Sequence, residues 1–244
     1  MLNQSRVTWG GLKCHLVDAL PAGQSPTRLV FLAHGFGAPG TDLVPLAEAL
    51  FESEPALETA VRFVFPAAPL SLEAEGISGR AWWPLNLARL QSQLASGRFE
   101  DVRKEKPPGL PEARGMIHAL IQDACTATGL TPSQCILGGF SQGAMVMMDA
   151  AVSLSEAVGG LVLLSGAVVN EGVWKAGVAK LSTIPVFQSH GRYDVVLPFL
   201  AGEWLRDLWS ANTPPVEFVA FNDGHTIPWP VLTALGTFLK ARLA

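Results

Sequence analysis

A serine stands between two glycines in the stretch GFSQG, residues 139–143, which fits the pattern G-x-S-x-G. This pattern is typical of a sharp turn between a strand and a helix that presents the serine, here Ser141, as a nucleophile. Glycine is required at positions 139 and 143 for a physical reason: the turn brings backbone segments together, and a Cβ at Gly139 or Gly143 would obstruct it. About one chain in seven of this composition would match by accident, so the motif needs catalytic partners to support it.

The residues on either side of Ser141 fit the same interpretation. The apolar run Cys135–Phe140 precedes it and the apolar helical pattern QGAMVMMDAAVSL follows it, which is the strand–turn–helix context that the motif requires. The serine would then lie at the carboxyl edge of a parallel sheet, where ligands bind, and the helix N-terminus would favour developing negative charge. The alternative is an ordinary glycine-rich turn in which Ser141 caps the helix.

A nucleophilic serine needs a base that accepts its proton, and only His190 and His225 follow Ser141 in the chain. In enzymes with this turn the partners follow in the order Ser, Asp or Glu, and His. His225, in FNDGHTIP, comes directly after the last strand-like run, whereas His190 ends an earlier run and precedes Asp194. We therefore predict His225 as the base; the alternative is a surface-loop histidine.

The acid that orients the base is predicted to be Asp194, in HGRYDVVLP. It is far enough from both Ser141 and His225 for one strand–helix unit to fit on each side. Asp223 is only two residues from His225, and so close a neighbour would have difficulty reaching the imidazole Nδ1. Asp207 falls within a helical pattern. The alternative for Asp194 is a solvated loop carboxylate.

Acyl transfer also needs two backbone N–H groups aimed at the oxyanion of the tetrahedral intermediate. One is expected from the residue after the nucleophile, Gln142. The other is expected in the turn HGFG, residues 34–37, directly after the run Arg28–Ala33, because glycines let the backbone approach the substrate carbonyl. We predict the N–H of Phe36 as this second donor.

The elements that must position these residues alternate between strand-like and helical patterns. Nearly continuous apolar character is typical of strands covered on both faces, as in a parallel sheet. Such runs are Arg28–Ala33, Val61–Phe65, Cys135–Phe140, Gly160–Ser165, Pro185–His190 and Val216–Phe221, with a weaker antiparallel edge strand at Leu12–Val17. Helical patterns occupy residues 42–51, 110–128, 142–154, 198–209 and 230–243. The repeated β-then-α order predicts a doubly wound, mostly parallel α/β sheet.

One segment, at about residues 71–110, interrupts this alternation as an irregular insertion. Its end is strongly charged, with nine charged residues among the seventeen from Arg98 to Arg114. A solvated excursion is one interpretation, and a short lid or substrate loop is the other. Trp82 and Trp83 are predicted walls of an apolar acyl pocket, with core aromatics as the alternative. An exposed Trp near the insertion could serve a homodimer contact.

Composition narrows the possible partners. A net charge of −4 without a basic stripe argues against nucleic acid. Cys14, Cys125 and Cys135 are odd in number and widely spaced, and the five His are scattered, so we expect reduced thiols and no metal site. No apolar run is long enough to span a bilayer, and the start lacks the apolar core of a secretory signal. We expect a cytoplasmic protein without stable membrane insertion.

Four blocks of the chain together resemble those of the phospholipase/carboxylesterase family, which includes the acyl-protein thioesterases. They are HGFGAPGTDL, GGFSQGA, SHGRYDVVLP and DGHTIP, and the resemblance runs from about Arg28 to the C-terminus. It implies an α/β-hydrolase fold. It also implies the same site residues as the reasoning above: Ser141, Asp194 and His225 as the triad, with Phe36 and Gln142 as oxyanion donors.

The sequence differs from the thioesterase branch of this family in two places. The thioesterase branch usually has Gly-Gly after its serine turn, whereas Gly143 is followed here by Ala144. The stretch between WWPLN and PGLPEA is also longer than in the thioesterases. RAWWPLN with PGLPEAR looks more like the bacterial esterase branch, which favours ester hydrolysis over protein depalmitoylation.

The sequence therefore predicts a serine carboxylesterase that folds as a single α/β-hydrolase domain over residues 1–244 and needs no cofactor. Its substrates would be small-molecule esters, with short to medium acyl chains transferred through an acyl-enzyme. Lysophospholipid or acyl-thioester hydrolysis uses the same machinery and stays open. A dienelactone-type hydrolase normally has Cys at the turn, and Ser141 argues against it. A non-catalytic binding module predicts a broken set of catalytic residues, whereas all are present.

Overall fold

An eight-stranded sheet forms the centre of the structure, a computed structural model that describes residues 2–86, 89, 92–93, 96 and 99–243. The strands lie in the order β1-β2-β4-β3-β7-β8-β9-β10. Their bounds are β1 Asn3–Trp9, β2 Leu12–Asp18, β3 Arg28–Ala33, β4 Val61–Pro66, β7 Cys135–Phe140, β8 Gly160–Leu164, β9 Val186–Gly191 and β10 Glu217–Phe221. The pairs β1–β2 and β2–β4 are antiparallel, and every other pair in the sheet is parallel.

The six strongly apolar runs are all confirmed as strands, with ends that agree to about one residue. The weaker prediction at Leu12–Val17 is also a strand and is antiparallel, but it is not at the edge of the sheet. The edge strand on this side of the sheet is β1, Asn3–Trp9, which the sequence pattern did not indicate. Its first four residues are exposed, so β1 carries no apolar face that a pattern could show.

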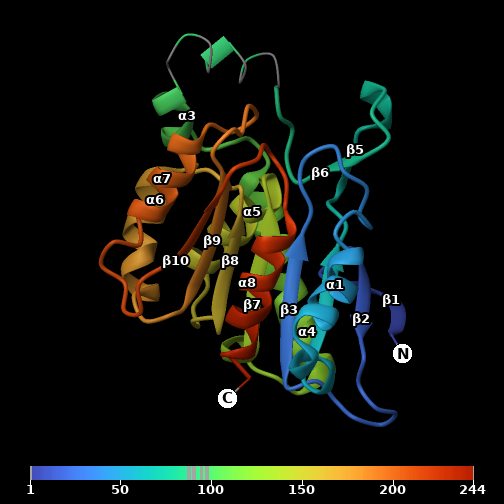
Figure 1. The fold of residues 1–244 in the computed structure, drawn as a ribbon. Coiled ribbons are helices and arrows are strands. Elements are labelled where there is room, and N and C mark those ends of the chain that lie inside the picture. Colours follow the sequence, from blue (N-terminus) through green and yellow to red (C-terminus); the bar gives the residue numbers. More distant parts are fainter. Residues whose placement is uncertain (1, 87–88, 90–91, 94–95, 97–98, 244) are drawn as a thin grey trace.

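Helices cover both faces of this sheet. The α-helices whose bounds the structure describes are α1 Pro45–Ser53, α3 Phe99–Lys104, α4 Leu110–Thr128, α5 Gln142–Ser153, α6 Glu171–Val178, α7 Phe199–Asp207 and α8 Trp229–Lys240. Short 3-10 turns are η1 Pro55–Thr59, η2 Glu73–Glu75, η3 Pro132–Gln134 and η4 Ala179–Leu181. The five predicted helices are confirmed, whereas α3 and α6 were not predicted. Figure 1 shows α8 in front of the sheet and α5 behind it.

Alternate residues of the central strands supply two hydrophobic cores, one on each face. Phe31 and Leu137 belong to the core that includes α4 and α5, whereas Val30 and Ile136 belong to the core that includes α1 and α8. This double coverage explains why these strands read as nearly continuous apolar runs. The sequence thus predicted the α/β class correctly.

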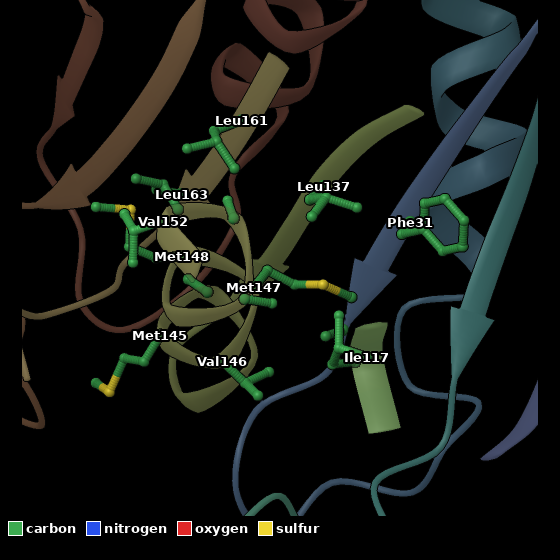
Figure 2. Close-up of a cluster of buried hydrophobic side chains, with 14 of the residues drawn as sticks. Phe31, Ile117, Leu137, Met145, Val146, Met147, Met148, Val152, Leu161 and Leu163 are labelled. Carbon is green, nitrogen blue, oxygen red and sulfur yellow. The ribbon is translucent and has the colours of Figure 1, made fainter. Parts of the chain in front are cut away.

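Helix α5, which begins directly after Ser141, is the most deeply buried of the described helices. Every residue from Gln142 to Val152 is buried, as the all-round apolar pattern predicts. Met147 projects from α5 toward Ile117 of α4, and Met145 projects to the opposite side (Figure 2). Burying one such side chain contributes about 1.5–3 kcal/mol, so the helix behind the serine turn is held firmly in place.

The predicted insertion is partly packed against the body of the protein. It begins with a small hairpin of β5, Leu70–Ser71, and β6, Arg80–Ala81, and ends with α3 before α4 starts. Trp82 and Trp83 are 1% and 2% exposed, so neither of these two indoles is the exposed Trp expected near the insertion. Parts of the insertion, residues 87–88, 90–91, 94–95 and 97–98, lie outside the described residues.

Within the described residues, no helix combines the length and the apolar character that crossing a membrane requires.

Candidate active site

Ser141 occupies a strained turn between β7 and α5. Its backbone φ is 55° and its ψ is −120°, and its side chain makes no capping hydrogen bond. A helix-capping serine has an extended backbone and accepts a hydrogen bond from the first turn, so the capping alternative is not what the structure shows. Such a conformation costs about 1–3 kcal/mol and typically persists where it has a function.

The two glycines of the motif make this turn possible. A Cβ at Gly139 would lie 2.6 Å from the Ala33 oxygen and 2.5 Å from the carbonyl carbon of Gly143. A Cβ at Gly143 would collide with the same Ala33 oxygen. The turn after β7 and the end of β3 therefore approach each other at backbone distance, which brings Ser141 next to the turn that holds Phe36.

His225 and Asp194 form a hydrogen-bonded pair at the same edge of the sheet. His225 Nδ1 lies 2.6 Å from Asp194 Oδ2, and the loops after β10 and β9 supply the two residues. The other carboxylate oxygen, Oδ1, accepts the N–H groups of Val196 at 2.9 Å and Leu197 at 2.8 Å. An ionised carboxylate only accepts hydrogen bonds, so Nδ1 of His225 carries the proton and Nε2 is left as an acceptor.

The environment keeps Asp194 ionised although its side chain is fully buried. Burial opposes ionisation, but the hydrogen bond from His225 and those from the Leu197 and Val196 N–H groups outweigh it. The pKa of Asp194 therefore lies below its ordinary value. A carboxylate held in this way can stabilise positive charge on His225.

His190 and Asp223, the alternatives considered for the base and the acid, do not replace His225 and Asp194. His190 is fully buried and donates through Nε2 to the Leu197 oxygen at 2.8 Å, while burial lowers its pKa. It lies 3.5 Å from Asp194 Oδ2 and so packs behind the carboxylate. Asp223 accepts the N–H of its neighbour Gly224 at 2.7 Å. The structure thus brings Asp194, and not Asp223, to His225.

A cavity of about 940 Å³ brings together Ser141 and His225, which both line it. Its other walls are mostly apolar, with contributions from Trp83, Leu85, Val102, Met145, Val169 and Val196. Trp83 lines the cavity. Trp82 does not, because its indole is turned into the core, where Nε1 donates to the His34 oxygen at 2.9 Å. Several wall residues belong to the predicted insertion, which therefore forms part of the cavity wall.

Phe36 and Gln142, the predicted oxyanion donors, line the same cavity. Gln142 is the first residue of α5, and the first N–H groups of a helix have no partner within the helix. Within the described residues, no hydrogen bond engages the N–H of either residue. Both donors are therefore available to a ligand at Ser141.

Sequence reasoning missed the parts of the site that depend on contacts between distant segments. These are the side chain of Gln142, the buried ring of His34, and the turn Val195–Leu197, which both orients Asp194 and lines the cavity. The motifs HGFG, GFSQG and DVVLP contain these residues, but the motifs do not disclose which side chains meet. Within the described residues, no three His, Cys, Asp or Glu side chains gather where they could hold a metal ion.

The order of the strands, with a strained serine after β7 and a His–Asp pair from the loops after β9 and β10, is that of an α/β hydrolase. The chain belongs to the phospholipase/carboxylesterase family, whose model matches residues 19–243. The resemblance seen in the sequence is thereby confirmed, and the chain is a hydrolase of the esterase and thioesterase family.

Similar proteins cover nearly the whole chain. Acyl-protein thioesterase 1 of Eremothecium gossypii is 32% identical over 229 residues, covering 92% of each chain. Acyl-protein thioesterase 1 of Saccharomyces cerevisiae is 28% identical over 232 residues, covering 91% of this chain and 95% of the relative. The crystal structure of esterase PE8 superposes with a TM-score of 0.74 at 27% identity, covering 98% of each chain.

Proposed function

We propose that the chain is a serine carboxylesterase in which Ser141 is the nucleophile, His225 the base and Asp194 the orienting acid. One observation carries the assignment: His225, joined to the buried Asp194 at 2.6 Å, lines the same cavity as a serine in a strained strand-to-helix turn. Family membership and the esterase neighbour support ester hydrolysis, and they are independent of this geometry.

The reaction follows from the protonation states in the site. His225 Nε2 accepts the Ser141 proton as Oγ attacks the acyl carbonyl, and Asp194 stabilises the imidazolium that forms. The N–H groups of Phe36 and Gln142 bind the oxyanion of the tetrahedral intermediate. His225 then gives its proton to the leaving alcohol, and water activated by the same histidine hydrolyses the acyl-enzyme.

The size and lining of the cavity indicate that it binds an apolar acyl group of the substrate. Its volume of about 940 Å³ is near the upper end of ordinary small-molecule sites, about 300–1,000 Å³, and its walls are largely apolar. We propose short to medium acyl chains as substrates. We also propose that residues 1–244 act as one catalytic domain, which the single large sheet and the family match over residues 19–243 support.

Acyl-thioester hydrolysis is the second candidate function, because the relatives named above are acyl-protein thioesterases. The same nucleophile and oxyanion donors would act on a thioester. Kinetics on p-nitrophenyl esters of increasing chain length, on palmitoyl-coenzyme A and on lysophosphatidylcholine separate the candidates. A higher kcat/KM on the thioester than on every oxygen ester would favour the thioesterase.

A fluorophosphonate probe tests the nucleophile directly. The probe phosphonylates an activated serine and leaves ordinary serines unmodified. We expect one adduct by intact mass, on the Ser141 peptide after digestion, and none after heat denaturation. Absence of an adduct on the native protein would favour a non-catalytic binding module.

Phe36→Ala provides a prediction with a small expected effect. The proposed donor at this position is the backbone N–H, which alanine retains. Removing an oxyanion donor lowers kcat by about 10²- to 10³-fold. The decrease in kcat of Phe36→Ala on p-nitrophenyl acetate should therefore be much smaller. A loss of that larger size in a folded variant would instead assign the phenyl ring a packing role that shapes the turn.

A further inference from the structure

The side chain of Gln142 makes a contact that its backbone role in the oxyanion hole does not explain. Gln142 is only 2% exposed, and its side-chain amide forms two hydrogen bonds. Oε1 accepts the N–H of Trp82 at 2.9 Å, and Nε2 donates to the Trp83 oxygen at 3.0 Å. The residue that follows the nucleophile is thereby tied to a segment about sixty positions earlier in the chain.

That segment is in turn tied to the turn that holds the other oxyanion donor. The indole Nε1 of Trp82 donates to the His34 oxygen at 2.9 Å, and the two rings lie 5.8 Å apart. His34 Nε2 accepts the N–H of Ala68 at 3.0 Å, so Nδ1 carries the proton and donates to the Gly35 oxygen at 2.8 Å. Burial lowers the pKa of His34, which keeps this ring neutral.

A second set of contacts connects the same two segments. The N–H of Gly37 donates to the Arg80 oxygen at 2.9 Å, and the N–H of Arg80 donates to the Ala38 oxygen at 3.0 Å. The guanidinium of Arg80 also donates to the Ala68 and Pro69 oxygens. Residues 79–83, which we name the bracing segment, therefore hold the backbone on both sides of Phe36.

We propose that the Gln142 side chain is a positioning residue that sets the separation of the two oxyanion donors through the bracing segment. One residue then acts twice: its N–H binds the oxyanion, and its amide fixes where the N–H of Phe36 lies. Preorganised donors stabilise an oxyanion because they need no reorganisation during the reaction. This inference rests on the proposed function of the site.

Gln142→Met tests the inference, since methionine fills a similar volume, keeps the backbone N–H and removes both amide hydrogen bonds. We expect kcat/KM on p-nitrophenyl acetate to fall by about 10- to 10²-fold, less than outright loss of a donor costs. Trifluoromethyl hexyl ketone adds to Ser141 as a hemiketal whose oxyanion occupies the hole. Its inhibition constant should rise by the same factor, whereas that of methyl hexyl ketone, which binds without an oxyanion, should stay unchanged.

Gln188→Met is the matched control. Gln188 is also fully buried and donates through Nε2 to the Gly202 oxygen at 2.7 Å, away from the bracing segment. We expect both Gln142→Met and Gln188→Met to lower the melting temperature. Only Gln142→Met should change the ratio of the two inhibition constants. If Gln142→Met does not fold, Trp82→Phe carries the test. It keeps the backbone N–H that Gln142 accepts, removes the Nε1 hydrogen bond to His34 together with part of the buried indole, and should shift the same ratio less.

Two results would overturn the inference while leaving the proposed function intact. One is that neither inhibition constant changes in Gln142→Met, or in Trp82→Phe where the first variant is unfolded. The other is an equal loss of affinity for both ketones, which would mean a general collapse of the cavity. A wild-type protein that neither turns over the ester nor binds the trifluoromethyl ketone would instead overturn the proposed function itself.

Discussion

Ser141→Ala is expected to lower kcat on p-nitrophenyl acetate by about 10⁴- to 10⁶-fold, as removal of a catalytic serine does in comparable enzymes. The hydroxyl is the atom that forms the acyl-enzyme, and no other group at the turn can replace it. The Ser141 side chain makes no capping hydrogen bond, so its removal leaves no N–H group of the first turn of α5 without a partner that it had. The variant should therefore lose turnover and keep its melting temperature.

The chain offers a close control for this experiment in Ser165. This serine follows β8, the neighbour of β7 in the sheet, and is the other serine with a positive φ, 46°, among the described residues. It is fully buried and does not line the cavity. Ser165→Ala should retain wild-type turnover. Wild-type turnover in Ser141→Ala would mean that another residue is the nucleophile.

The sequence predicted the sheet well because its central strands are buried on both faces. Each apolar run of β3, β7 and β8 reflects a strand between two cores, and such runs have few other interpretations. The missed elements have weak patterns for a physical reason. Strand β1 is largely exposed, and α6 has eight residues, too few for a helical period to stand out.

The site could be predicted only where order along the chain constrains it. Ser141, Asp194 and His225 must follow in that order from the ends of different strands, and only two histidines lie downstream of the serine, which narrowed the choice of base. The orientation of Trp82 and Trp83 depends instead on Gln142 and His34, which are far away in sequence. Adjacent indoles give no pattern that tells which one faces the core and which one faces the cavity.

Asp194→Asn is expected to lower kcat by about 10⁴-fold, the cost of fixing the base in the wrong tautomer. Two backbone N–H groups, those of Val196 and Leu197, require an acceptor at the Oδ1 position. The asparagine oxygen must take that position, because the flipped amide would leave both donors unpaired, and the buried N–H of Leu197 alone would cost about 1–3 kcal/mol. The amide nitrogen then faces His225 and donates to Nδ1. The imidazole proton is forced onto Nε2, which can no longer accept the proton of Ser141.

The same geometry predicts that this loss falls on kcat and leaves KM nearly unchanged, since Asp194 is buried and does not line the cavity. Asp223→Asn is the matched control, because Asp223 lies two residues from His225 and its carboxylate bonds only the N–H of Gly224 among the described residues. It should keep wild-type turnover. If Asp223→Asn lost activity and Asp194→Asn kept it, the acid would be Asp223, and the hydrogen bond between Asp194 and His225 would serve only to anchor the loop.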